Sequence, residues 1–156
     1  MYMSVATNQS FVYDGVTVPP DAMRTVITNV TISDGVTSIR EKAVYGCEKL
    51  QSVGGSIGTV ENVGNLAFAY CKSLKSISLP VATNVGGTAF YECTSLTSVS
   101  LPVATTVSDK AFYGCTSLKE VEINGAKVDV SKLQLIDPDS PCYSFESFIS
   151  TNFPCF

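Results

Sequence analysis

The stretch AFYECTSLTSVSLP, from Ala89 to Pro102, recurs along this chain of 156 residues. Related copies are AVYGCEKLQSV from Ala43, AFAYCKSLKSISLP from Ala67 and AFYGCTSLKEVEI from Ala111. The single cysteine of each copy falls at 47, 71, 93 or 115, so the spacings are 24, 22 and 22 residues. A fixed period in the low twenties indicates a solenoid of stacked repeats, because each repeat is too small to bury its own apolar face.

The apolar residues of each copy define one rung of that solenoid. In the third copy they are Leu96, Val99 and Leu101, with Ser98 and Ser100 between them. This alternation with a period of two predicts a short strand with one buried face. The same slots are filled by Ile27, Val30 and Ile32; Leu50 and Val53; Leu74, Ile77 and Leu79; and Leu118, Val121 and Ile123. The sequence therefore predicts about five rungs.

A second apolar set follows each strand. We assign to it Val36 and Ile39, Val60 and Val63, Val81 and Val85, and Val103 and Val107. An Ala-Phe or Ala-Val pair comes next, where Ser108 or Asp109 would cap a helical turn over residues 110–113. The expected fold is an α/β solenoid, a short leucine-rich-repeat arc with one strand and one helical turn per repeat.

The string A-F-Y-x-C-T-S-L-x-x-V-x-L/I resembles the BspA-like leucine-rich-repeat family over residues 26–123. This resemblance implies adhesion or protein binding, no catalytic activity and no cofactor. It also implies an extracellular or cell-surface location, because the family is found in surface proteins of bacteria and some protists.

The ends of the chain depart from the repeat. We expect an N-terminal cap over residues 1–25, in which Phe11, Val12, Val16 and Val18 add an irregular strand. Residues 26–123 form the repeats, and residues 124–156 form a C-terminal cap with another strand near Val128 and Val130. Solenoid ends expose core residues and need such covers.

Composition limits the function. A net charge of −4 and a pI near 4.7 argue against nucleic acid binding, which needs a basic face. No apolar run approaches the roughly 20 residues of a membrane span, and Met1 to Ser10 lacks the basic and apolar regions of a signal peptide. The chain has no histidine, which excludes Ser-His-Asp triads and His-ligated zinc within this chain.

The cysteines fall into two groups. The four repeat cysteines share one slot beside the core and are expected to be buried free thiols, because buried cysteine behaves as a small hydrophobe. Their spacing of about 22 residues has a structural cause and lacks the local pairs of a metal site, so no metal is expected. Cys142 and Cys155 lie outside the repeats, where a disulfide between them is an open alternative.

Two sets of residues compete as the binding site. The preferred set is aromatic. It comprises the edge where Tyr45, Tyr91 and Tyr113 share a slot, with Tyr70 nearby, or the aromatic tail around Phe145 and Phe148. Tyrosine combines a large ring with a hydroxyl and is enriched in binding hot spots. The second candidate is the outward strand face, which is built of small polar residues: Ser76, Ser78, Ser98, Ser100, Glu120 and Glu122.

These observations favour a non-enzymatic binding or adhesion module. Its expected partner is a protein, such as an extracellular host protein, and a glycan is the less favoured ligand. The alternative is a structural component of a surface layer or virion appendage that acts through self-association.

Overall fold

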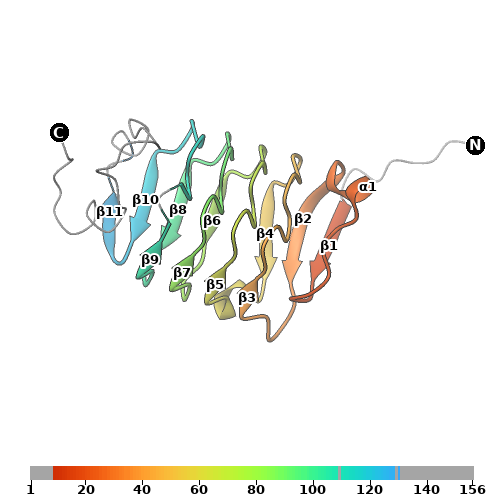
Figure 1. Cartoon of the computed structure of the whole chain (residues 1–156), viewed down its shortest axis with the longest axis horizontal. Helices are drawn as coiled ribbons and strands as arrows, with labels where there is room; N and C mark the ends of the chain where they lie inside the picture. The colour runs from red at the N-terminus through yellow and green to blue at the C-terminus, as the bar shows by residue number, and fades with distance from the viewer. Residues whose placement is uncertain (1–8, 109, 129, 131–156) are drawn as a thin grey trace, which may run out of the picture.

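The chain winds into a β-solenoid of about five turns (Figure 1). The computed structural model describes residues 9–108, 110–128 and 130. One row of strands holds β2 (Ile27–Ile32), β4 (Ser52–Gly55), β6 (Ser76–Ser78), β8 (Ser98–Leu101) and β10 (Glu120–Ile123). A second row holds β3 (Ser38–Ile39), β5 (Asn62–Val63), β7 (Asn84–Val85) and β9 (Thr106–Val107). The predicted leucine-rich stack of about five rungs is thereby confirmed.

The register of the first row agrees with the repeat. Ser76, Ser98 and Glu120 are paired in parallel, as are Ile77, Val99 and Val121. The inward residues are buried, among them Leu96 with no exposed surface, whereas Val53 is only half-buried. Apolar burial of about 1.5–3 kcal/mol per large side chain therefore accumulates along one continuous core.

The first row is not one continuous sheet. The strands form one sheet in the order β1-β2-β4, where β1 spans Gln9–Tyr13, and another in the order β6-β8-β10-β11. Gly55, which ends β4, has a φ of 79° and replaces the apolar residue of other rungs. A Cβ at this position would lie 2.4 Å from the carbonyl oxygen of Ile32, so only glycine fits. The chain then turns into the 3-10 helix η1 (Ile57–Thr59), whose Ile57 packs against the core.

The second row corrects one predicted register. Val81 and Val103 are 38% and 43% exposed, whereas Ala82 and Ala104 are buried. The alanines align with Val36 and Val60, which are also buried, three residues before the inward residue of the next strand. The sequence favoured the larger valine for the inward position, but in these later coils, the later turns of the solenoid, the neighbouring alanine is the buried residue.

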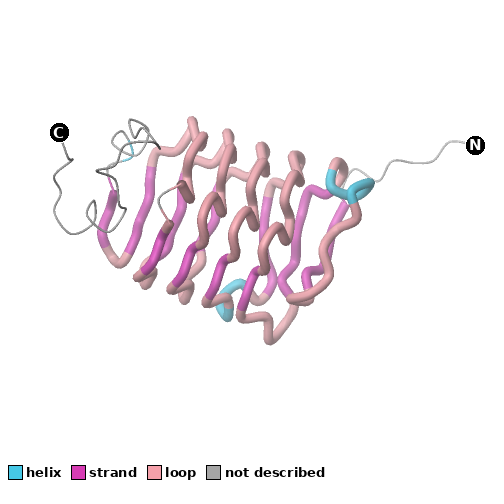
Figure 2. The backbone as a smooth tube through the Cα atoms, in the orientation of Figure 1, coloured by secondary structure: helices cyan, strands magenta, loops and turns pink. Residues whose placement is uncertain are grey.

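The predicted helical turn is wrong. Within the described residues, helix is confined to α1 (Asp21–Arg24), η1 and the single residue 130 (Figure 2). The segment after each second-row strand is instead a run of turns whose backbone N–H groups alternate between two kinds of acceptor. Ala43, Tyr45 and Cys47 donate to carbonyls three residues earlier, at distances of 3.2–3.3 Å.

The N–H groups between them bond to the next coil. Those of Lys42, Val44 and Gly46 donate to the carbonyls of Asn65, Ala67 and Ala69 at 2.9–3.0 Å. The following coil repeats the arrangement with donors at Leu66, Phe68 and Tyr70. A helix would direct every N–H along its own axis, so this bonding between coils replaces the helix.

The N-terminal end is completed by side chains. β1 pairs in parallel with β2 and buries Phe11 and Tyr13, whereas Val12 and Val16 are 59% and 70% exposed. The register of this pairing shifts between Gln9 and Ser10, so the strand is irregular as predicted, but its inward set differs from the one predicted. The Tyr13 hydroxyl accepts the N–H of Arg40 at 2.9 Å. In later coils the equivalent N–H groups, of Gly64 and Gly86, bond to the preceding coil's carbonyl.

The Arg24 side chain likewise provides a hydrogen-bond partner that a preceding coil would supply, in this case for the turn segment. Its guanidinium donates to the carbonyl of Tyr45. In later coils the carbonyls in that slot, of Ala69, Tyr91 and Tyr113, accept an N–H of the preceding coil. Side chains of residues 13 and 24 therefore replace backbone groups that a preceding coil would supply.

At the other end, β10 continues into β11 (Ala126–Val128) through an antiparallel hairpin. Asn124 and Gly125 both have positive φ, 50° and 73°, as a type I′ turn requires. Val128 lies on the predicted additional strand, and Val130 is buried just after it. The division into residues 1–25, 26–123 and 124–156 remains a prediction.

Candidate binding surface

Four tyrosines form a row along one edge of the solenoid. The ring centroids of Tyr45 and Tyr70, of Tyr70 and Tyr91, and of Tyr91 and Tyr113 are each 5.4 Å apart. The first two pairs meet edge to face at 77° and 73°, and the last pair is stacked at 9°. The first three rings are half-buried and Tyr113 is 43% exposed. We call these four residues the tyrosine row.

The turn segment positions this row. In the last two described copies a phenylalanine precedes the tyrosine and enters the core, where Phe68, Phe90 and Phe112 stack with centroids 5.3 and 5.4 Å apart. Because the neighbouring residue points the other way, Tyr91 and Tyr113 project outward. Hydrogen bonds between coils hold the backbone at both residues.

Tyr70 reaches the row from a different slot. Its backbone has a φ of 61°, at the position of Gly46 and Gly114 in other coils, and Ala69 is buried in the tyrosine slot. Bulky residues rarely take this left-handed conformation. Burial, followed by the neighbouring Tyr91 and Tyr45, raises the pKa of Tyr70. Tyr70 stands one residue later in its repeat than the other three tyrosines. For this reason the sequence placed it near the row and did not identify it as a member.

A shallow trough of about 400 Å³ lies along three of the four rings. It is lined by Lys42, Tyr45, Leu66, Tyr70, Thr88 and Tyr91. The sequence interpretation missed Lys42, Leu66 and Thr88. Their shared slot, one residue before each repeat's alanine, is the signal that could have placed them beside the tyrosines.

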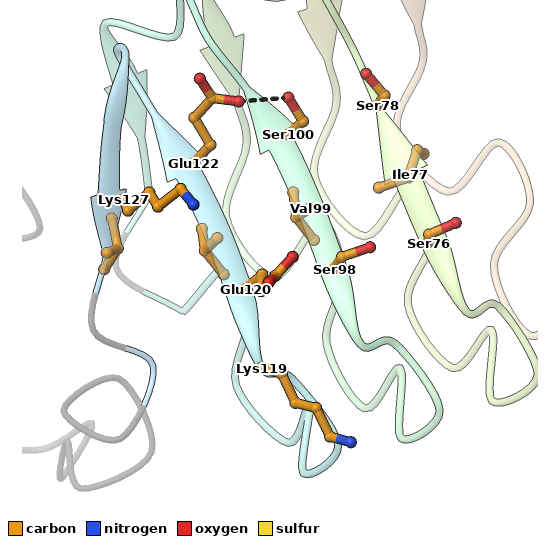
Figure 3. A pocket seen from close by; sticks show the side chains of 12 residues that line it. Ser76, Ile77, Ser78, Ser98, Val99, Ser100, Lys119, Glu120, Glu122 and Lys127 are labelled. Carbon is orange, nitrogen blue, oxygen red and sulfur yellow. Dashed lines mark hydrogen bonds between the residues drawn. The ribbon is translucent and has the colours of Figure 1, made fainter.

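The strand face carries a second groove, of about 460 Å³ (Figure 3). Its lining includes all six predicted strand-face residues: Ser76, Ser78, Ser98, Ser100, Glu120 and Glu122. Lys119 and Lys127 also line it and were not predicted. Lys127 lies on β11, directly across from Glu122, so only the hairpin could reveal it.

Polar contacts within the strand-face groove are sparse. Glu122 accepts a hydrogen bond of 2.8 Å from the hydroxyl of Ser100. Among the described residues, the ion pairs lie elsewhere, between Arg24 and Asp21 and between Lys72 and Glu48. The groove thus presents hydroxyls and separate charges, with no aromatic ring.

The four repeat cysteines are free and buried. The thiols of Cys71, Cys93 and Cys115 donate to carbonyls of the preceding coil, those of Val44, Phe68 and Phe90, at 3.4, 3.0 and 3.0 Å. Burial raises the pKa of Cys47 to about 11, and it also raises the pKa of Cys71. A hydrogen bond with Cys115, and then burial, raise the pKa of Cys93. These thiols are components of the core and are unsuited to nucleophilic chemistry.

Phe145, Phe148, Cys142 and Cys155 lie outside the described residues, so the aromatic tail and the disulfide remain predictions. In the described part, no group of three or more His, Cys, Asp or Glu side chains is arranged to hold a metal ion. The helices described there are too short to cross a bilayer.

A sequence profile described as the BspA type leucine rich repeat region matches six copies within residues 23–134. The chain belongs to this family. The BspA-type match extends beyond residues 26–123, where the resemblance was read from the sequence. Among curated proteins, none matches this chain.

Solved leucine-rich repeat proteins have a similar fold. A leucine-rich repeat protein from Bacteroides ovatus is 28% identical, with a TM-score of 0.61 over 72% of this chain and 30% of that one. A leucine rich repeat protein from T. pallidum is 23% identical, with a TM-score of 0.63 over 74% of this chain and 59% of that one. This chain therefore matches less than two thirds of the length of either protein.

Proposed function

We propose that this BspA-type solenoid is a non-enzymatic module that binds a protein partner through the tyrosine row. The observation that carries the proposal is the unbroken series of four rings at 5.4 Å, with a trough along three of them. Tyrosine loses little conformational entropy on binding, buries a large area and keeps a hydroxyl for hydrogen bonding. Family membership supports exposure at the cell surface and an extracellular protein as the partner.

The strand-face groove is the weaker candidate. Its serines supply little contact area, and Glu120 and Lys119 are exposed. A standard interface buries about 800 Å² on each partner, which small hydroxyls alone do not provide. The interruption between β4 and β6 also shortens the strand face.

Paired variants separate these surfaces. Extracellular host proteins would be captured on the immobilised chain and identified, and each partner would then be titrated against two double variants. Tyr91→Ser with Tyr113→Ser should weaken binding about tenfold or more, as expected for hot-spot residues. Ser76→Arg with Ser98→Arg should change it less than about twofold. The opposite ranking would move the site to the strand face.

Self-association is the second candidate function. It is favoured by the position of β1 at the outer edge of its sheet, where parallel pairing could continue with another chain. Light scattering of the purified chain would support it by showing a defined oligomer, and a monomer at all concentrations would contradict it.

A further inference from the structure

The backbone around the trough limits what can bind there. The N–H groups of Lys42, Leu66 and Tyr70 donate to the next coil at 3.0, 3.2 and 2.7 Å. The intervening N–H groups, such as those of Tyr45 and Ala69, bond within their own turn. An extended partner could not pair with this edge as an added strand, because strand addition needs a row of unpaired donors and acceptors.

The backbone N–H and C=O groups of a partner segment in the trough must therefore find hydrogen-bond partners other than the backbone of this chain. A polyproline II segment has no internal hydrogen bonds, and each proline removes one donor that would need a partner. Its exposed carbonyls match the donors that line the trough, which are tyrosine hydroxyls and the Lys42 ammonium. Aromatic-lined grooves are a general means of recognising such segments.

The spacing of the rings agrees with this conformation. Successive centroids are 5.4 Å apart, so every second ring lies roughly 10 Å along the row, and polyproline II advances roughly 9 Å every three residues. Prolines three residues apart would therefore contact Tyr45 and Tyr91, with Tyr70 between them.

Charge indicates one further requirement. The Lys42 side chain is exposed at the trough, and it makes no hydrogen bond or ion pair with any described residue. Lys72, which does not line the trough, is by contrast paired with Glu48 at 3.0 Å. An acidic residue of the partner would complement Lys42.

We propose that the trough binds an extended proline-rich segment with two prolines three residues apart and an acidic residue placed against Lys42. This inference rests on the proposed function of the tyrosine row as a protein-binding surface. It specifies the conformation and charge of the partner segment.

The test uses the full chain and three labelled ten-residue peptides, followed by fluorescence anisotropy. The first peptide carries two Pro-x-x-Pro units and a terminal Asp, the second replaces the prolines with Ala, and the third replaces the Asp with Asn. The first should bind about tenfold or more tightly than the second, a difference of about 1.4 kcal/mol. No binding of the first peptide at millimolar concentration, or equal binding of the second, would overturn the inference.

Variants of the chain assign the contacts. Tyr70→Asn keeps a residue that tolerates a positive φ, and it should weaken binding of the first peptide about tenfold. Lys42→Gln should weaken the first peptide about threefold and leave the third unchanged, whereas Lys119→Gln, in the strand-face groove, should affect neither. Binding unaffected by Tyr70→Asn would contradict the inference, as would a helical peptide that binds the row more tightly.

The two proposals fail in different ways. If a captured protein partner depends on Tyr91 and Tyr113 while the proline-rich peptide does not bind, only the polyproline inference is overturned. If that partner ignores both tyrosines, the function proposed for the row is wrong as well.

Discussion

Adjacent residues of the repeat have opposite roles, as Phe90 and Tyr91 demonstrate. Phe90 has no exposed surface and stacks between two other phenylalanines, whereas Tyr91 is half-buried in the outer row. The turn segment therefore builds a core stack and a surface row from consecutive positions. The difference in stabilisation between a buried and an outward side chain is simpler to measure on the strands, by substitution and unfolding.

Leu96 and Ser98 provide that comparison. Leu96→Ala should lower the free energy of unfolding by roughly 2–5 kcal/mol, because a fully buried leucine leaves a cavity. Ser98→Ala, on the outward face, should change it by less than about 0.5 kcal/mol. Urea unfolding followed by circular dichroism measures both. Equal costs would mean that the strand register is wrong.

The repeat could predict such positions only where size and polarity agree. Leu96 and its equivalents are large and apolar in every described rung, so their burial was evident. Val81 and Val103 are large and apolar as well, yet their neighbours Ala82 and Ala104 are buried instead. Hydrophobicity alone could not decide which of two adjacent apolar residues, valine or alanine, is the one that turns inward.

At the scale of the element, the turn segment explains why the predicted helical turn was wrong and why the slot of the buried cysteines was predicted correctly. A period of 22 with an Ala-Phe pair suggested a helical turn, but positive φ angles at Lys42, Leu66 and Thr88 are incompatible with one. Backbone N–H groups that donate to the next coil stabilise this conformation. The sequence of one repeat does not reveal a hydrogen bond between repeats. The slot of the cysteines could nevertheless be predicted, because one small apolar residue recurs there.

The buried thiols predict a dependence of stability on pH. The folded pKa of Cys47 is raised to about 11, above an unfolded value of about 8.5, so folding retains a proton that the unfolded chain releases. The contribution is complete below about pH 8.5 and is lost as pH rises toward 11, at about 1.4 kcal/mol per pH unit for each such thiol.

Reduced protein unfolded in urea at pH 7, 9 and 10 measures this slope. Cys93→Ala removes one thiol whose pKa is raised and should make the decline less steep. An identical slope in the variant and the natural chain would show that the thiols do not retain their protons on folding.

Tyr13 should be specifically required at the first coil. Tyr13→Phe leaves the Arg40 N–H without its 2.9 Å acceptor, which should cost about 1–3 kcal/mol. Hydrogen exchange should accelerate at the Arg40 amide. Tyr113→Phe removes the same atom from an exposed ring and is the matched control. Unchanged exchange at Arg40 would exclude this role of the hydroxyl.

At the scale of the whole molecule, stacking turns a weak local pattern into continuous surfaces. The repeat predicted the solenoid, its strand register and the edge that carries Tyr45, Tyr91 and Tyr113. It did not predict the break in strand pairing between β4 and β6. Nor could it predict Lys127 in the strand-face groove, which a hairpin brings back against β10.

The central claim is that the coils turn phenylalanine inward and tyrosine outward as an accessible row. Hydroxyl-radical footprinting of the native chain, read by mass spectrometry, tests it most directly. We expect modification at Tyr45, Tyr70 and Tyr91, the strongest at Tyr113, and protection of Phe68 and Phe90 until the chain is unfolded. Equal native modification of Phe90 and Tyr91, or protection of all four tyrosines, would contradict the account.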